Sequence, residues 1–295
     1  MYVAQGLSEE AELRRLCEAA YNARAAVPEF ADIMVGWELS AAAYREEAEA
    51  ELDLPYLDEL GGGSARTLLD LFWPRGRNRD SCPLSLYVHG GYWQALDRKY
   101  FSHLARGPNR RGMAMAIASY DLCPHLDIPG IERQIACACL YLWNTLKRRP
   151  IVCGHSAGGH LTACMLAYDF SALDAGAPGD LVPAGVAVSG LFDLRDLVYT
   201  SINDKLGLTL DTAERASPAF RAAPRGKRLI AQVGARESEA FHWQSKEIVR
   251  RWRDGGAVTQ YVNVADTNHF TVIGGLADPD SALVGSLEWL SAASA

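Results

Sequence analysis

The sequence has neither a long apolar stretch nor a long run of like charges. A membrane-spanning helix needs about 18 or more consecutive apolar residues, and no such run is present. The 36 acidic and 29 basic residues are spread along the chain and give a formal net charge of −7, so no basic patch for nucleic acid stands out. Residues 1–6 lack the basic and apolar regions of a signal peptide. We therefore expect a cytoplasmic protein that binds neither a membrane nor nucleic acid.

The sequence also lacks the spacings of a metal site. Its seven cysteines are scattered, mostly within apolar patterns that are typical of a protein core. Cys137 and Cys139 have no second pair at the spacing of a zinc site. His155 and His160 are five positions apart, a spacing that does not place both side chains on one face of a helix. We expect no metal and no other cofactor.

The N-terminal part of the chain has the spacing of helices. Ser8, which is followed by acidic residues, is the expected cap of a first helix, and Pro28 interrupts the pattern. Apolar residues recur at helical spacing again over 31–48.

A turn-rich stretch over 51–66 indicates a domain boundary. We expect residues 1–60 to form a helical segment and residues 61–295 to form the main domain. The helical segment either packs against an edge of the main domain or covers part of its site as a partial cap, and we favour the partial cap.

Apolar strand patterns alternate with helical patterns along the rest of the chain. With 295 residues, of which 49% are hydrophobic, the chain is long enough to bury a large core. Alternation of this kind predicts an α/β fold with a mostly parallel sheet and helices on both faces. The expected strands are 67–73, 83–88, 113–120, 151–152, 185–190, 228–233 and 259–264.

The pattern Gly-x-Ser-x-Gly at residues 154–158 lies between an expected strand and an expected helix. Without β-carbons, its glycines allow a tight turn that holds Ser156 in a strained conformation above the sheet edge. The backbone N–H of Ala157, at the start of the helix, would face the oxyanion that forms when the Ser156 hydroxyl attacks a carbonyl. An ordinary glycine-rich turn is the alternative, but the strand-turn-helix context favours a nucleophile.

A second glycine pair follows the strand at 83–88, in the sequence His89-Gly90-Gly91-Tyr92-Trp93. The N–H groups of Gly91 and Tyr92 would point at the same oxyanion as the N–H of Ala157. Tyr92 and Trp93 either fill the core or line a pocket for a planar substrate, and we expect them to bind substrate together with His155. His89 is expected to hold the loop by hydrogen bonds.

The base is expected in a loop after the last strand, because nucleophile, acid and base follow in this chain order in folds with such a turn. His269 follows the strand 259–264 and a run of turn residues. His103, His125 and His242 follow the wrong strand or lie within a helix, so His269 is the predicted base.

The acid is expected after a late strand. Glu237 follows the strand 228–233, where its carboxylate would accept a hydrogen bond from the imidazole and stabilise the imidazolium. Glu239, Asp266 and Asp193 remain alternatives. Glu239 is better placed to begin a helix, where acidic side chains favour the helix dipole.

With these motifs, the chain from about Tyr21 onward resembles the arylformamidase (kynurenine formamidase) group of the α/β-hydrolases. The glycine loop and the sequence Tyr120-Asp121-Leu122-Cys123-Pro124 are also similar to the hormone-sensitive-lipase-like esterases. The resemblance rests on His89–Trp93, Gly154–Leu161, Tyr21-Asn22 with Arg24 and Val27, Ser189–Leu194 and Asn268–Phe270.

The resemblance implies hydrolysis of N-formyl-L-kynurenine to L-kynurenine and formate in tryptophan breakdown. It implies Ser156 as nucleophile, His269 as base and an acid at the position of Glu237, where the family usually has aspartate. The unrelated metal-dependent formamidases carry a histidine-rich motif that this chain lacks.

Two other classes of function are compatible with the residues. A carboxylesterase or amidase for small acyl or aryl substrates would use the same machinery. A binding protein of the same fold normally has lost a member of the triad, whereas all three roles can be filled here. The expected partner is a small aromatic amide or ester, and the sequence leaves the oligomeric state open, a homodimer included.

Overall fold

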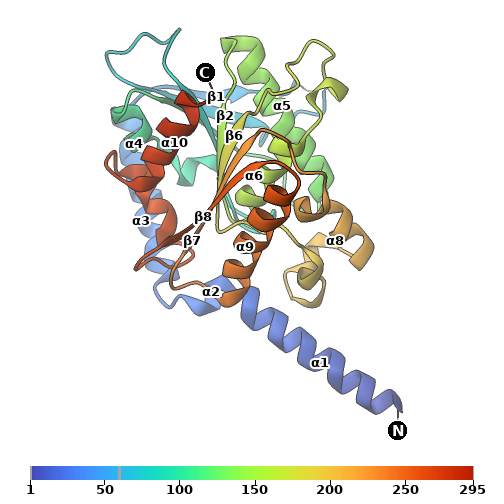
Figure 1. The fold of residues 1–295 in the computed structure, drawn as a ribbon. Coiled ribbons are helices and arrows are strands. Elements are labelled where there is room, and N and C mark those ends of the chain that lie inside the picture. The colour runs from blue at the N-terminus through green and yellow to red at the C-terminus, as the bar shows by residue number, and fades with distance from the viewer. Residues whose placement is uncertain (1, 59–60, 295) are drawn as a thin grey trace.

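An eight-stranded sheet runs through the centre of the structure, a computed structural model that describes residues 2–58 and 61–294 (Figure 1). The strands lie in the order β1-β2-β4-β3-β5-β6-β7-β8. Neighbours from β4 to β8 are parallel, whereas β1 and β4 both pair with β2 in antiparallel orientation. The strands are β1 Glu49–Pro55, β2 Leu68–Trp73, β3 Leu84–Val88, β4 Ala114–Ala118, β5 Ile151–His155, β6 Ala184–Val188, β7 Arg228–Gly234 and β8 Val258–Val264.

The central strands are buried along their whole length. Every residue of β3, β4, β5 and β6 is buried, as expected for short apolar strands that are covered on both faces of a parallel sheet. Strand β5 pairs with β3 on one side and β6 on the other. The turn after β5 therefore lies in the middle of the carboxyl edge of the sheet, where open α/β sheets place their ligands.

Helices cover both faces of the sheet, as expected from the sequence. Figure 1 shows α4 and α10 on one side and α5, α6, α8 and α9 on the other. These helices are α4 Arg106–Arg110, α5 Ile128–Leu146, α6 Ala157–Ala167, α8 Leu210–Ala216, α9 Glu239–Asp254 and α10 Ala282–Ala292. The short helix α7 spans Asn203–Leu206. The 3-10 helices are η1 Arg98–Tyr100, η2 Ser102–Ala105, η3 Phe170–Ala172, η4 Arg195–Tyr199, η5 Pro218–Phe220 and η6 Thr271–Ala277.

Three helices precede the sheet: α1 Tyr2–Tyr21, α2 Ala23–Ala26 and α3 Phe30–Glu47. Helix α1 extends away from the rest of the molecule (Figure 1). It begins at Tyr2, so Ser8 lies inside the helix and is not its cap. A first break comes at Asn22, whose side chain accepts a hydrogen bond from the N–H of Ala25 and so caps α2. A second break lies between α2 and α3 and contains Pro28, as predicted.

The first strand differs from the prediction, because β1 lies within the segment 1–60 that was expected to be helical and turn-rich. Strand β1 pairs with β2 at the edge of the sheet, and its register shifts between Glu51 and Leu54, at a bulge where Asp53 has a φ of 57°. Five of its seven residues are exposed. An exposed edge strand needs no apolar pattern, so the sequence carries little signal for it.

No helix of the described residues is long and apolar enough to cross a membrane.

Candidate active site

Ser156 occupies a strained turn between β5 and α6. It has φ 56° and ψ −116°, and its N–H donates to the carbonyl of Val188 on the neighbouring strand β6. A β-carbon at Gly158 would lie 1.9 Å from the carbonyl oxygen of Val88, so only glycine permits this approach of α6 to β3. Strain of this kind is retained where the surrounding structure fixes it, often at functional sites. The turn therefore has the geometry that the sequence pattern predicted.

His269 and Glu237 form a buried pair. The Nδ1 of His269 lies 2.7 Å from Oε2 of Glu237, and the Glu237 side chain is fully buried. The other carboxylate oxygen, Oε1, accepts hydrogen bonds from the Ser189 hydroxyl at 2.5 Å and the Gly234 N–H at 2.7 Å. Burial on its own would raise the pKa of Glu237. The interaction of the carboxylate with the His269 ring and the hydrogen bonds from His269, Ser189 and Gly234 outweigh burial and hold the pKa of Glu237 below its usual value.

The three alternative acids lie elsewhere. Asp266 has a side chain that is 88% exposed and pairs with Arg236 at 3.1 Å. Asp193 pairs with Arg195 at 2.7 Å. Glu239 is exposed and is the first residue of α9, as its sequence position indicated. Of the four candidate acids, Glu237 is the one that is hydrogen-bonded to His269.

His155 fixes the backbone of His269. Its Nε2–H donates to the carbonyl oxygen of His269 at 2.7 Å, and the two rings are 4.8 Å apart. Burial, followed by the neighbouring His269, lowers the pKa of His155 to about 3, so the ring is neutral near pH 7. His155 lines the same pocket as Ser156 and His269. In this position it supports His269, the predicted base, in addition to any contact with substrate.

Three backbone N–H groups near Ser156 have no hydrogen-bond partner in the part of the chain that the structure describes. Gly91 and Tyr92 have φ angles of 105° and 51°, conformations that turn the loop tightly after β3. Among the described residues, no hydrogen bond uses the N–H of Gly91, Tyr92 or Ala157. Gly91 and Tyr92 line the pocket that also contains Ser156, and Ala157 follows Ser156 at the start of α6. These donors are available to a ligand.

His89 is buried at the base of this loop. Its Nδ1–H donates to the carbonyl of Gly90 at 2.8 Å, and its ring stacks on Tyr120 with 4.3 Å between ring centroids. The Tyr120 hydroxyl donates to the carbonyl of His89 at 2.9 Å. The hydrogen bonding expected of His89 is present.

Trp93 does not line the pocket, which corrects the prediction that it binds substrate. It is completely buried, and its ring meets His160 edge-on at 5.0 Å. Because φ is 55° at Trp93, the side chains of Tyr92 and Trp93 leave the loop in different directions. Tyr92 reaches the pocket, whereas Trp93 fills the core.

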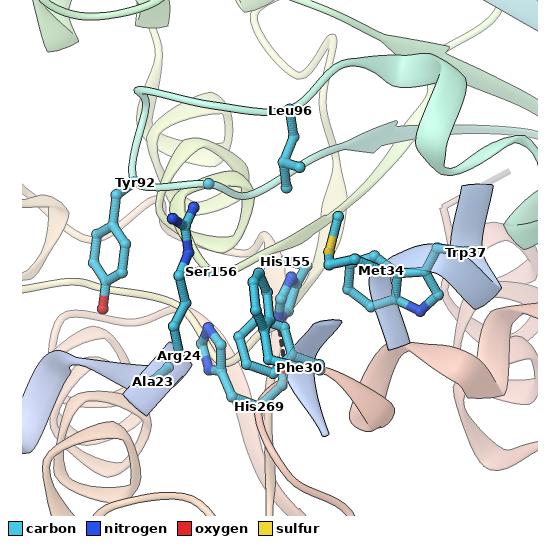
Figure 2. A pocket seen from close by; sticks show the side chains of 12 residues that line it. Ala23, Arg24, Phe30, Met34, Trp37, Tyr92, Leu96, His155, Ser156 and His269 are labelled. Atoms are coloured by element: carbon cyan, nitrogen blue, oxygen red, sulfur yellow. Dashed lines mark hydrogen bonds between the residues drawn. The ribbon is translucent and has the colours of Figure 1, made fainter. Parts of the chain in front are cut away.

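The pocket around Ser156 holds about 430 Å³ of empty space, its open mouth included, and its wall is mostly apolar. In Figure 2, His269 and His155 lie near Phe30, Met34 and Trp37, and Tyr92 lies beyond Arg24. The helices α2 and α3 contribute several lining residues that the sequence did not identify as site residues. The complete lining is Ala23, Arg24, Phe30, Met34, Trp37, Gly91, Tyr92, Leu96, His155, Ser156, His269 and Phe270.

Comparisons with known proteins agree with this geometry. A family profile described as BD-FAE matches residues 69–194. Kynurenine formamidases of Danio rerio and Drosophila melanogaster are each 27% identical to the chain. The alignment with the Danio rerio protein covers 79% of this chain and 79% of that protein. The alignment with the Drosophila melanogaster protein covers 76% of this chain and 78% of that protein.

Solved structures share the whole fold. The crystal structure of a candidate thioesterase from Silicibacter sp. is 34% identical, covers 92% of this chain and 98% of its own, and has a TM-score of 0.80. An esterase of Pyrobaculum calidifontis is 16% identical, covers 96% and 98%, and has a TM-score of 0.68. An esterase of the bacterial hormone-sensitive lipase family is 19% identical, covers 90% and 98%, and has a TM-score of 0.65.

The mostly parallel sheet and the strained serine turn agree with the similarity to kynurenine formamidases and with the fold shared with esterases. The chain is an arylformamidase-like hydrolase of the α/β-hydrolase family.

Proposed function

We propose that the protein hydrolyses aryl formamides, with N-formyl-L-kynurenine as the substrate and L-kynurenine and formate as the products. The observation that carries the proposal is the pocket in which Ser156 and His269 lie against an apolar, aromatic wall, with Glu237 bonded behind His269. An aryl leaving group suits such a wall, because aromatic side chains offer both contact area and a preferred geometry. The kynurenine formamidase relatives support the same choice.

In the proposed mechanism, His269 Nε2 removes the proton of the Ser156 hydroxyl while Oγ attacks the formyl carbon. The N–H groups of Gly91, Tyr92 and Ala157 donate hydrogen bonds to the oxyanion. The imidazolium, held through Nδ1–H by Glu237, then gives its proton to the aniline nitrogen, and the C–N bond breaks. A formyl ester remains on Ser156.

Water then attacks this ester. His269 takes a proton from the water, and a second oxyanion forms between the same N–H groups. Breakdown of that intermediate releases formate, and the proton returns from His269 to Ser156 Oγ. The free enzyme is restored with one water consumed.

We further propose that α2 and α3, in the helical part of the segment 1–60, act as a partial cap. Phe30, Met34 and Trp37 lie on α3 and line the pocket opposite Leu96. A cap of this kind excludes water and shapes the leaving-group site.

The proposal is tested by measuring kcat/KM for N-formyl-L-kynurenine and for p-nitrophenyl acetate with purified protein, with Ser156→Ala as the blank. We expect far higher efficiency on the formamide, and a loss of several powers of ten in the variant. If only the ester is cleaved, the alternative of a carboxylesterase or amidase for other small substrates replaces the formamidase.

A further inference from the structure

A second, more polar pocket adjoins the one that contains Ser156. It holds about 760 Å³ of empty space, open solvent included. Four residues line both pockets: Ala23, Arg24, Gly91 and Tyr92. The hydroxyl of Tyr92 donates to the carbonyl of Tyr21 at the end of α1 and so links the glycine loop to the N-terminal helices. A substrate that reacts at Ser156 and extends past Arg24 would therefore enter the second pocket.

Arg24 is exposed and has no anionic partner among the residues that the structure describes. Its guanidinium lies over the ring of Phe30, 5.3 Å from the ring centroid, and no hydrogen bond or ion pair of its side chain occurs among the described residues. Figure 2 shows the side chain rising from α2 between His269 and Tyr92, with the guanidinium directed toward the loop that carries Tyr92. Arg221, by contrast, pairs with the buried Glu132 at 2.5 Å. Within the described part of the chain, the charge of Arg24 is therefore unpaired at a pocket wall.

The second pocket has an excess of positive charge. Lys205, on α7, also lines it and is exposed. The single carboxylate in its wall belongs to Glu18.

Glu18 is already engaged by three donors. It accepts hydrogen bonds from the N–H of Ser201 at 2.8 Å, the hydroxyl of Ser201 at 2.9 Å and the side-chain amide of Asn22 at 3.0 Å. The hydrogen bond from the Ser201 N–H, together with those from the Ser201 hydroxyl and Asn22, lowers the pKa of Glu18. Glu18 thus ties α1 to the segment around Ser201 and does not neutralise Arg24.

We infer that Arg24, with Lys205 beyond it, binds a carboxylate on the leaving group of the substrate. A guanidinium presents a planar fork of donors that matches a carboxylate and binds it with two parallel hydrogen bonds. The inference rests on the proposed function, because it takes the chemistry at Ser156 as given. It narrows the substrate class to aryl amides or esters whose leaving group carries a carboxylate, as that of N-formyl-L-kynurenine does.

The experiment compares matched neutral and anionic substrates. Formanilide and 3-formamidobenzoate form one pair, and phenyl acetate and 3-acetoxybenzoate form the other. In each pair, the preference is the kcat/KM of the anionic substrate divided by that of the neutral one, measured at constant ionic strength because salt screens exposed charges. Wild type is expected to prefer the anionic member.

Arg24→Gln is expected to reduce this preference about 10- to 100-fold, the range of a hydrogen bond to a charged group, mainly through KM. Arg24→Lys keeps the charge without the fork and is expected to recover part of the preference. The matched control is Arg215→Gln, because Arg215 is an exposed arginine of α8 that pairs with Asp211 and lines neither pocket. The control should keep the wild-type preference. Circular dichroism and thermal unfolding establish that each variant is folded.

The two pairs separate this inference from the proposed function. If neither formamide is hydrolysed but the anionic ester is preferred in a way that depends on Arg24, the proposed formamidase function is wrong and the carboxylate site stands. If wild type has no preference, or Arg24→Gln keeps it, the carboxylate site is wrong. A last experiment tests benzoate and inorganic phosphate as inhibitors of phenyl acetate hydrolysis by wild type. Inhibition by phosphate but not by benzoate would also overturn the proposed carboxylate site, because the bound anion would then be a phosphate.

Discussion

Replacing Glu237 by glutamine removes the negative charge behind His269 while keeping the size of the side chain. In the structure, Oε1 of Glu237 faces two donors, the Ser189 hydroxyl and the Gly234 N–H, and Oε2 faces His269 Nδ1. A glutamine can offer an oxygen to only one of these sides. The position of its NH₂ group therefore decides the outcome.

With the amide NH₂ toward Gly234, two N–H groups would face each other in a fully buried site, at a cost of about 1–3 kcal/mol for an unsatisfied donor. We expect the opposite orientation, with the NH₂ toward His269. Nδ1 must then accept a hydrogen bond, so the neutral ring carries its proton on Nε2, where it cannot accept the proton of Ser156. The same tautomer error in the Ser-His-Asp enzymes lowers kcat by about 10⁴-fold, and we predict a loss of about 10³- to 10⁴-fold for Glu237→Gln.

The assay is the steady-state kinetics of p-nitrophenyl acetate and N-formyl-L-kynurenine across pH. The loss should appear in kcat, with a smaller change in KM. Glu237→Asp keeps the charge but shortens the side chain by one methylene, and a displacement of about 1 Å can cost on the order of 10²-fold. Asp266→Asn is the matched control, because Asp266 is exposed and lies in the loop before His269. If Glu237→Gln keeps activity within about tenfold of wild type while Asp266→Asn abolishes it, Glu237 is not the acid.

Three further perturbations test the supporting structure. His155→Leu removes the hydrogen bond to the His269 carbonyl and should lower kcat by about 10-fold or more with little change in KM, whereas unchanged kinetics would exclude the positioning role. Gly158→Ala places a β-carbon 1.9 Å from the Val88 oxygen and should destabilise the fold by more than about 3 kcal/mol or prevent soluble expression, so a variant with the wild-type urea midpoint would contradict the turn geometry. Burial lowers the pKa values of His89 and His160 to about 4 and of His155 to about 3, below the value of 6.5 in the unfolded chain. Between the folded and unfolded pKa values, the unfolded chain binds more protons than the folded protein. The free energy of unfolding is therefore at its full value above about pH 6.5 and should fall by about 1.4 kcal/mol per pH unit for each such histidine toward pH 4. A constant Tm from pH 7 to 4.5 would refute this.

The features that could be predicted from sequence are those written in short, local patterns. The apolar strands and the glycines around Ser156 specify their geometry through nearest neighbours, and the seven expected strands are present in the structure with small shifts at their ends. The order of elements along the chain also fixes which loops reach the carboxyl edge of a parallel sheet. For that reason Glu237 and His269 could be proposed from their positions after β7 and β8, and they lie within hydrogen-bonding distance.

Features that depend on contacts between distant parts of the chain could not be predicted. Strand β1 forms because the edge of β2 is available, and its own residues are mostly polar and exposed. Trp93 points into the core because of the backbone path through Tyr92 and Trp93, which no apolar pattern encodes. Arg24 and Phe30 reach the pocket through the bend at Asn22, which sets α2 and α3 against the main domain. The sequence near Arg24 contributed to the family resemblance, but it did not show that Arg24 and Phe30 line the pocket, because this depends on where the chain turns.

The central claim is that Ser156 is the nucleophile that cleaves the aryl formamide. The most direct measurement is to treat the folded protein with a fluorophosphonate, map the modified peptide by mass spectrometry and follow turnover of N-formyl-L-kynurenine in the same samples. The account predicts modification at Ser156 and a loss of turnover in proportion to the fraction of Ser156 that is modified. Full turnover with Ser156 completely modified, or an unreactive Ser156 in protein that hydrolyses the formamide, would contradict it.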